Sequence, residues 1–134
     1  MAFQIKRIYE SALPSDGTRV LVDRLWPRGV KKTDALLDYW MKDVAPSSEL
    51  RRWFGHIPAR FGEFRRQYEA ELTDNPSVGE LRNLGRDNSV TLLYAAHDPE
   101  VNHALVLRSV LQRGSTAERV TPAKKAASKK PARR

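Results

Sequence analysis

The chain has 134 residues, of which 40% are hydrophobic and none is cysteine, and it carries a formal charge of +8. This length suits one folded domain, and the apolar fraction excludes a chain that is disordered throughout. The lack of cysteine excludes disulfides, thiolate metal sites and a thiol nucleophile, and it agrees with the cytoplasmic location that we expect. No apolar run approaches the roughly 20 residues that cross a bilayer, so no membrane-spanning segment is expected.

The positive charge is concentrated towards the end of the sequence. Eight of the 24 basic residues and one of the 16 acidic residues fall within residues 113–134, which gives this segment +7 and the first 112 residues +1. The segment is rich in Lys, Ala and Pro, and it cannot bury enough apolar surface to offset the entropy of ordering. We expect an α/β domain over residues 1–113 and a disordered basic tail over residues 114–134.

Two strands are predicted in the first part of the chain. Residues 3–8 form an apolar segment that ends before the turn-forming residues 14–17, and residues 19–23 form a β-branched run. The second run stops at residues 26–29, where proline and glycine interrupt a ladder. Residues 35–44 fit a strand or a helix, because short apolar runs do not resolve the period, and we favour a strand.

Three helices are expected in the middle of the chain. Ser47 or Ser48 can cap a short helix over residues 49–54, Pro58 suits the first turn of a longer helix, and a third helix begins at Asn75-Pro76. The longer helix places core side chains on one face at Phe61, Phe64, Tyr68 and Leu72.

The last part of the domain predicts one strand and one helix. Residues 90–96 are apolar on both faces, as in a central parallel strand covered by helices, and Asp98-Pro99 caps a helix over residues 100–112. The whole pattern predicts a small three-layer α/β domain with a mainly parallel sheet flanked by helices.

Two polar clusters follow predicted strands, where ligands bind in parallel sheets. In the first cluster, the guanidinium groups of Arg24 and Arg28 could hold a phosphate or carboxylate bidentately. The alternative is structural: Asp23 pairs with one of the two arginines, and Trp26 packs in the core.

The second cluster is His97-Asp98. A helix N-terminus beside His97 would attract anions and favour the neutral imidazole that a catalytic acid–base residue needs. The alternative is that Asp98 is an ordinary N-cap and that His97 is exposed without a role.

Three separated motifs lie between residues 5 and 111. They are Asp23-Arg24-Leu25-Trp26-Pro27-Arg28-Gly29, Ala45-Pro46-Ser47 with Leu50-Arg51 and Trp53-Phe54-Gly55-His56, and Leu92-Leu93-Tyr94-Ala95-Ala96-His97-Asp98 with Asn102-His103-Ala104. Together they resemble the YeaO-like family, domain of unknown function 488. The resemblance implies a small α/β domain without an established activity. Other branches of the family carry a Cys-His-Arg element near the place of Asn102 and His103, which makes these two residues candidates for orienting a ligand.

Aromatic and basic residues between the two clusters are less informative. Trp53 and His56 could line a pocket, although core packing alone explains such aromatic residues. Arg51 belongs to a run in which bases alternate with acids, and we expect a solvated helix face there. The three histidines lack metal-ligand spacing and no P-loop or Gly-x-Gly-x-x-Gly motif occurs, so neither metal nor cofactor is expected.

Two hypotheses of function remain from the sequence. The first is binding of an anionic small molecule at the strand ends. The second is a nucleic-acid-associated module whose tail contacts phosphate backbones without base selectivity, the alternative being a solubilising extension. The oligomeric state stays open. The tail cations are Lys124, Lys125, Lys129, Lys130, Arg133 and Arg134.

Overall fold

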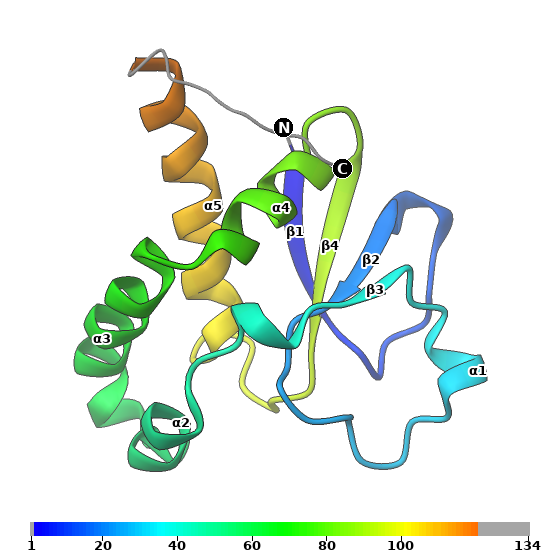
Figure 1. Ribbon diagram of the computed structural model, residues 1–134. Helices are drawn as coiled ribbons and strands as arrows, with labels where there is room; N and C mark the ends of the chain where they lie inside the picture. Colours follow the sequence, from blue (N-terminus) through cyan, green and yellow to red (C-terminus); the bar gives the residue numbers. More distant parts are fainter. Residues whose placement is uncertain (1, 121–134) are drawn as a thin grey trace.

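Four parallel strands form one sheet in the computed structural model, which describes residues 2–120 (Figure 1). β4 lies inside the sheet, pairs with β1 and β2, and is buried from Val90 to Tyr94. Apart from Thr91 its buried residues are apolar, as a strand covered on both faces requires, and the predicted α/β fold is confirmed. The strands are β1 (Ala2–Arg7), β2 (Thr18–Leu21), β3 (Tyr39–Trp40) and β4 (Ser89–Tyr94), in the order β1-β4-β2-β3.

The two faces of the sheet are covered unequally. Alternate side chains of a strand point to opposite faces, so Val20 and Leu92 join the main core while Leu21 and Leu93 lie in a smaller cluster. Figure 1 shows α3, α4 and α5 on one side of the sheet and the short α1 (Lys32–Ala35) on the other. The helices over the main core are α2 (Ser48–Phe54), α3 (Phe61–Thr73), α4 (Pro76–Leu84) and α5 (His103–Val120).

Three single-turn 3-10 helices complete the regular elements of the described residues: η1 (Pro14–Asp16), η2 (Lys42–Val44) and η3 (Pro58–Arg60). The expected cap of α2 is present, because the Ser47 side chain accepts from the Leu50 N–H. None of the helices within residues 2–120 is long and apolar enough to cross a membrane.

The expected strand over residues 35–44 is wrong except at Tyr39–Trp40, which forms β3. Leu36 ends α1 in the left-handed conformation with φ of 51°, and η2 follows the strand. β3 pairs only at the edge of the sheet, through two residues of β2, so no second partner extends it. The predicted strand is thus divided among three short elements, α1, β3 and η2.

The last helix begins at His103 and not at residue 100. Asn102, not Asp98, is its N-cap, because the Asn102 Oδ1 accepts from the Leu105 N–H at 3.0 Å. Asp98 instead closes a local turn by accepting from the Glu100 N–H at 2.8 Å. At its other end α5 continues to Val120 and crosses the predicted boundary between residues 113 and 114. The tail cations from Lys124 onwards lie outside the described residues.

A buried ion cluster closes the connection between β1 and β2. Asp16 in η1 is 3% exposed, and its carboxylate accepts hydrogen bonds from Lys6, Arg19 and the Leu13 N–H. Arg19, also buried, donates onward to the Ala35 carbonyl at the end of α1. Burial alone would raise the pKa of Asp16, but the hydrogen bonds from Leu13, Lys6 and Arg19 outweigh it and hold the pKa below its ordinary value.

Replacing Asp16 should destabilise the fold strongly. Asp16→Asn leaves the buried Arg19 without its counterion, and we expect the free energy of unfolding in urea to fall by about 3–5 kcal/mol at neutral pH. Because the folded pKa is depressed, the carboxylate stabilises the fold above its ordinary pKa and loses this effect as the pH falls through the folded pKa. The gap between wild type and variant should therefore shrink on acidification. Asp87→Asn, at an exposed turn, is the control, and an equal loss there would contradict the assignment.

Candidate functional site

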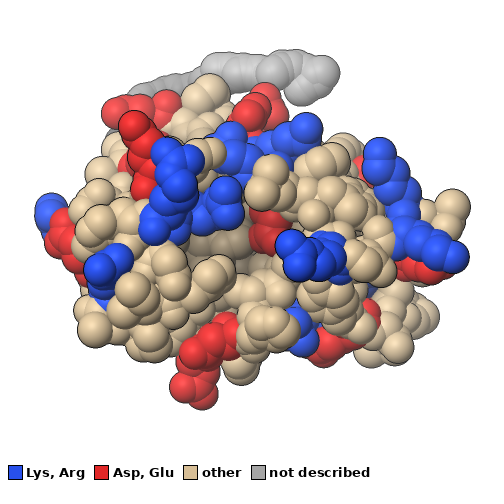
Figure 2. Space-filling model, turned by 90° about the horizontal axis from the view of Figure 1, so that it is seen from below, with Lys and Arg blue, Asp and Glu red and all other residues tan. Residues whose placement is uncertain are grey.

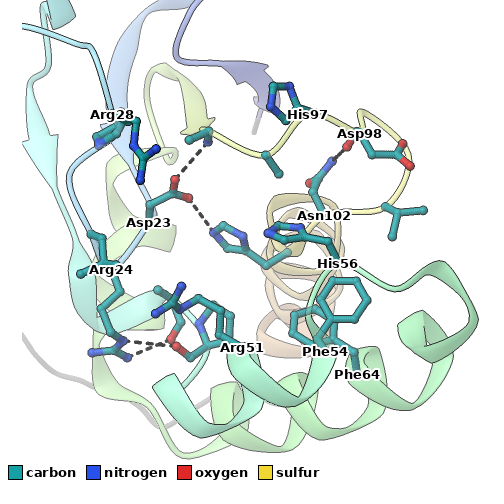
Figure 3. A pocket seen from close by; sticks show the side chains of 18 of the residues that line it. Asp23, Arg24, Arg28, Arg51, Phe54, His56, Phe64, His97, Asp98 and Asn102 are labelled. Atoms are coloured by element: carbon teal, nitrogen blue, oxygen red, sulfur yellow. Dashed lines mark hydrogen bonds and ion pairs between the residues drawn. The ribbon is translucent and has the colours of Figure 1, made fainter.

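A pocket of about 620 Å³ lies at the carboxyl ends of β2 and β4 (Figure 3). The segments that follow these strands form much of its wall. The remaining wall residues come from the segment after β1, from α2 and the residues on either side of it, from α3 and from the start of α5. This is the edge of a parallel sheet at which ligands bind. The lining residues are Tyr9, Asp23, Arg24, Leu25, Trp26, Pro27, Arg28, Ala45, Pro46, Arg51, Phe54, His56, Phe64, Ala95, Ala96, His97, Asp98, Val101, Asn102 and His103.

The candidate residues of the domain converge on this pocket, with one exception. Trp53 lies outside it, is 41% exposed, and packs its ring against the Arg60 guanidinium at 5.3 Å. Leu50 and Phe54 are the buried residues of α2, which turns the intervening Trp53 towards solvent. Its expected place in a pocket wall is therefore wrong. The residues that do converge are Arg24, Arg28, His56, His97, Asp98, Asn102 and His103.

Asp23 holds the floor of the pocket together. Its Oδ2 accepts from the Ala95 N–H at 3.0 Å, which ties the end of β2 to the end of β4. Its Oδ1 lies 3.1 Å from the Nε2 of His103, the first residue of α5. Among the described residues no ion pair joins Asp23 to Arg24 or Arg28. The structural alternative of an arginine partner is therefore wrong, and Asp23 lies beside a histidine instead.

The Nε2 of His103 carries a proton. It lies 3.0 Å from the Val22 carbonyl oxygen, which can only accept. The Nε2 hydrogen bond goes to that carbonyl, so the approach to Asp23 Oδ1 at 3.1 Å is a close contact and not a second hydrogen bond. Oδ1 is itself buried and accepts no hydrogen bond from the described residues. His103 thus supports the pocket floor and is not available as a free base through Nε2.

The arginines of the pocket differ in their contacts. Arg24 donates from Nε to the Pro46 carbonyl at 3.2 Å and from Nη2 to the Ala45 carbonyl at 3.3 Å. The preceding Val44 carbonyl accepts from the buried Tyr68 hydroxyl, whose pKa burial raises well above its ordinary value. Arg24 therefore fastens the segment after β2 to a segment that is already fixed to α3.

Arg28 and Arg51 are the free cations of the pocket. Both side chains are exposed, and neither guanidinium has a hydrogen bond or ion pair among the described residues. Figure 2, which looks at this edge of the sheet from below, shows Lys and Arg side chains around a hollow. Sequence reasoning missed Arg51. A signal existed, since Arg51 precedes the buried Phe54 by three residues and so borders the inner face of α2.

His97 is exposed and is held from one side only. Arg7 donates from Nε to the Ala96 carbonyl at 2.8 Å, and its Nη2 lies 3.5 Å from the His97 Nδ1. Because arginine can only donate, this contact requires an unprotonated Nδ1 and leaves Nε2 to other partners. The expected helix N-terminus beside His97 is absent, since α5 begins at His103, and the argument from a helix dipole at His97 is wrong.

The described side chains contain no group of three or more His, Asp and Glu residues that could hold a metal ion.

Asn102 is 1% exposed and makes two local contacts, accepting from the Leu105 N–H and donating to the Asp98 carbonyl at 2.9 Å. It orders the loop that ends at α5, and its amide is committed to that loop.

These features define a small parallel α/β domain with a pocket at the strand carboxyl ends. The chain belongs to the family described as the inactive DUF488-N3 subclade, whose model matches residues 2–131. It is 48% identical to the uncharacterized protein YeaO of Escherichia coli over 113 residues, which cover 84% of this chain and 98% of YeaO. An uncharacterized protein of Mycobacterium tuberculosis is 46% identical over 108 residues, or 81% of this chain and 92% of that protein. No solved structure matches the chain significantly. The resemblance drawn from the three motifs is confirmed.

The different contacts of Arg24 and Arg28 should separate their effects on stability. Arg24→Ala leaves two backbone carbonyls without their charged donor, and we expect a loss of about 1.5–3 kcal/mol in the free energy of unfolding. Arg28→Ala removes an exposed, unpartnered side chain and should change stability by less than about 0.5 kcal/mol. Urea denaturation of both variants measures the difference. Equal losses would show that Arg28 has a structural partner.

Proposed function

We propose that the pocket binds a small molecule bearing a phosphate or carboxylate group, and that it binds this molecule without converting it chemically. The observation that carries this proposal is the pair Arg28 and Arg51, two guanidinium groups that line the pocket without a partner among the described residues. A guanidinium presents a planar fork of donors that matches phosphate and carboxylate oxygens.

The acidic residues of the pocket oppose an anion only weakly. Asp23 faces the Ala95 N–H and the imidazole of His103, and its Oδ1 is buried. Asp98 accepts from the Glu100 N–H in its own turn. Each of these carboxylates accepts a hydrogen bond from a backbone N–H, while Arg28 and Arg51 remain available to a ligand. We assign His97 the role of an added donor through Nε2, in place of the acid–base role considered from the sequence.

Binding rather than catalysis is supported by two observations. The family description calls the subclade inactive, and the chain has no cysteine to act as a nucleophile.

The absence of cysteine is also our reason for proposing that the protein is cytoplasmic.

Neutral substitutions of the two free arginines test the proposal. Titration of the full chain with inorganic phosphate should show Kd rising about tenfold or more for Arg28→Gln and for Arg51→Gln, because a charge-assisted hydrogen bond contributes about 1.5–3 kcal/mol. Arg52→Gln is the matched control, since Arg52 is the exposed neighbour of Arg51 on α2 and does not line the pocket. Unchanged affinity in the two pocket variants, or an equal loss in the control, would refute the anion site.

We also propose that the basic tail gives the protein nonspecific affinity for nucleic acid. The supporting observation is the charge of +7 over residues 113–134 against +1 over the rest. Replacing Lys124, Lys125, Lys129 and Lys130 with Gln should weaken binding to a fluorescent DNA duplex. The plot of log affinity against log salt should flatten by about one unit for each phosphate that the tail no longer neutralises. An unchanged salt slope would assign the tail a different role.

A further inference from the structure

We propose that the ligand of this pocket joins its anionic group to a planar aromatic ring, as in an aryl phosphate or a nucleoside monophosphate. The inference rests on the proposed anion site and adds the class of molecule that the site accepts. It is carried by the size of the pocket, by the apolar character of one wall, and by the conformation of His56.

The pocket is far larger than an anion alone would fill. Its volume is about 620 Å³, whereas a phosphate ion has the size of a few water molecules of about 30 Å³ each. Pockets of roughly 300–1,000 Å³ hold whole organic ligands and bury most of their surface. A bare anion at Arg28 and Arg51 would leave most of this space to water.

The pocket has apolar surface away from Arg24 and Arg28. Phe54 and Phe64, which line it, stack with ring centroids 4.3 Å apart and an interplanar angle of 21°. Figure 3 shows Phe54 and Phe64 on one side of the pocket, Arg28 on the opposite side, and Arg51, which shares α2 with Phe54, between Arg24 and Phe54. A ligand that reaches from Arg28 to Phe54 therefore needs one charged end and one apolar end.

His56 favours a flat ring at the apolar end. It is one of two non-glycine residues with positive φ among the described residues, at 59°. This conformation costs free energy for a residue with a Cβ, and such strain is concentrated at binding sites. The imidazole is exposed, makes no hydrogen bond among the described residues, and lies 6.0 Å from the Phe54 ring. It presents a free aromatic surface beside Phe54 on which a ligand ring can stack.

Isothermal titration of the full chain with four probes tests the inference. The probes are inorganic phosphate, glycerol 3-phosphate, phenyl phosphate and adenosine monophosphate. Phenyl phosphate and adenosine monophosphate should bind at least about tenfold more tightly than glycerol 3-phosphate, and all four should weaken in Arg28→Gln.

The variant His56→Gly tests the contribution of the ligand's aromatic ring separately from that of its anionic group. Glycine adopts positive φ freely, so this variant should keep or raise the melting temperature of the fold. It should lose most of the advantage of the two aromatic probes while its affinity for glycerol 3-phosphate stays within about twofold of wild type. Arg52→Gln again serves as the control and should leave all four affinities unchanged.

The possible results separate this inference from the proposed function. If all four probes bind with equal affinity and depend on Arg28, the anion site stands and the aromatic class is wrong. If His56→Gly weakens glycerol 3-phosphate as much as phenyl phosphate, His56 contacts the anion and the ring assignment is overturned. If none of the four binds, the pocket is not a phosphate site, and the inference fails together with the phosphate form of the proposed function.

Discussion

The carboxylate of Asp23 joins three segments that are far apart in the chain. It accepts from Ala95 after β4, faces His103 at the start of α5, and itself follows β2. A parallel sheet brings its strand ends to one edge, but backbone pairing ends with the strands. The contacts of Asp23 continue the link between β2 and β4 beyond the last ladder bonds. The walls of the pocket depend on this link, because most of them consist of irregular chain on either side of it.

In this site, one pair of arginines holds the loops in place and a different pair stays free. Arg7 and Arg24 direct their donors at backbone carbonyls, at Ala96 and at Pro46, and thereby hold the two loops that flank Asp23. A charged donor is well suited to this task, since its hydrogen bonds are stronger than those of neutral groups. The loops are ordered without Arg28 and Arg51, whose guanidinium groups remain solvated. A site arranged in this way is largely formed before a ligand arrives, which reduces the ordering cost of binding.

Predictions from the sequence were correct where burial and periodicity agree. They failed where a side chain had a choice of partners. The apolar run of β4 and the aromatic face of α3 leave one reasonable interpretation each, and both are confirmed. Asp98 is the predicted cap of the last helix, but asparagine is an equally good N-cap residue, and Asn102 holds that position. Trp53 beside Phe54 shows the same limit, because the two residues lie on different faces of a helix whose orientation only the packed core determines.

The contacts of Asn102 and His103 offer a physical reason why the subclade is described as inactive. The resemblance places these residues near the Cys-His-Arg element of other branches, where a nucleophile would need an accessible and reactive side chain. Here Asn102 is buried with its amide committed to a helix cap and a turn, and His103 directs its Nε2 proton at the Val22 carbonyl. Groups that stabilise the start of α5 in this way are poorly placed to attack a substrate. The pocket beside them has a volume of about 620 Å³ and is lined by two free arginines, Arg28 and Arg51. The recognition role that we propose depends on these features and requires no nucleophile.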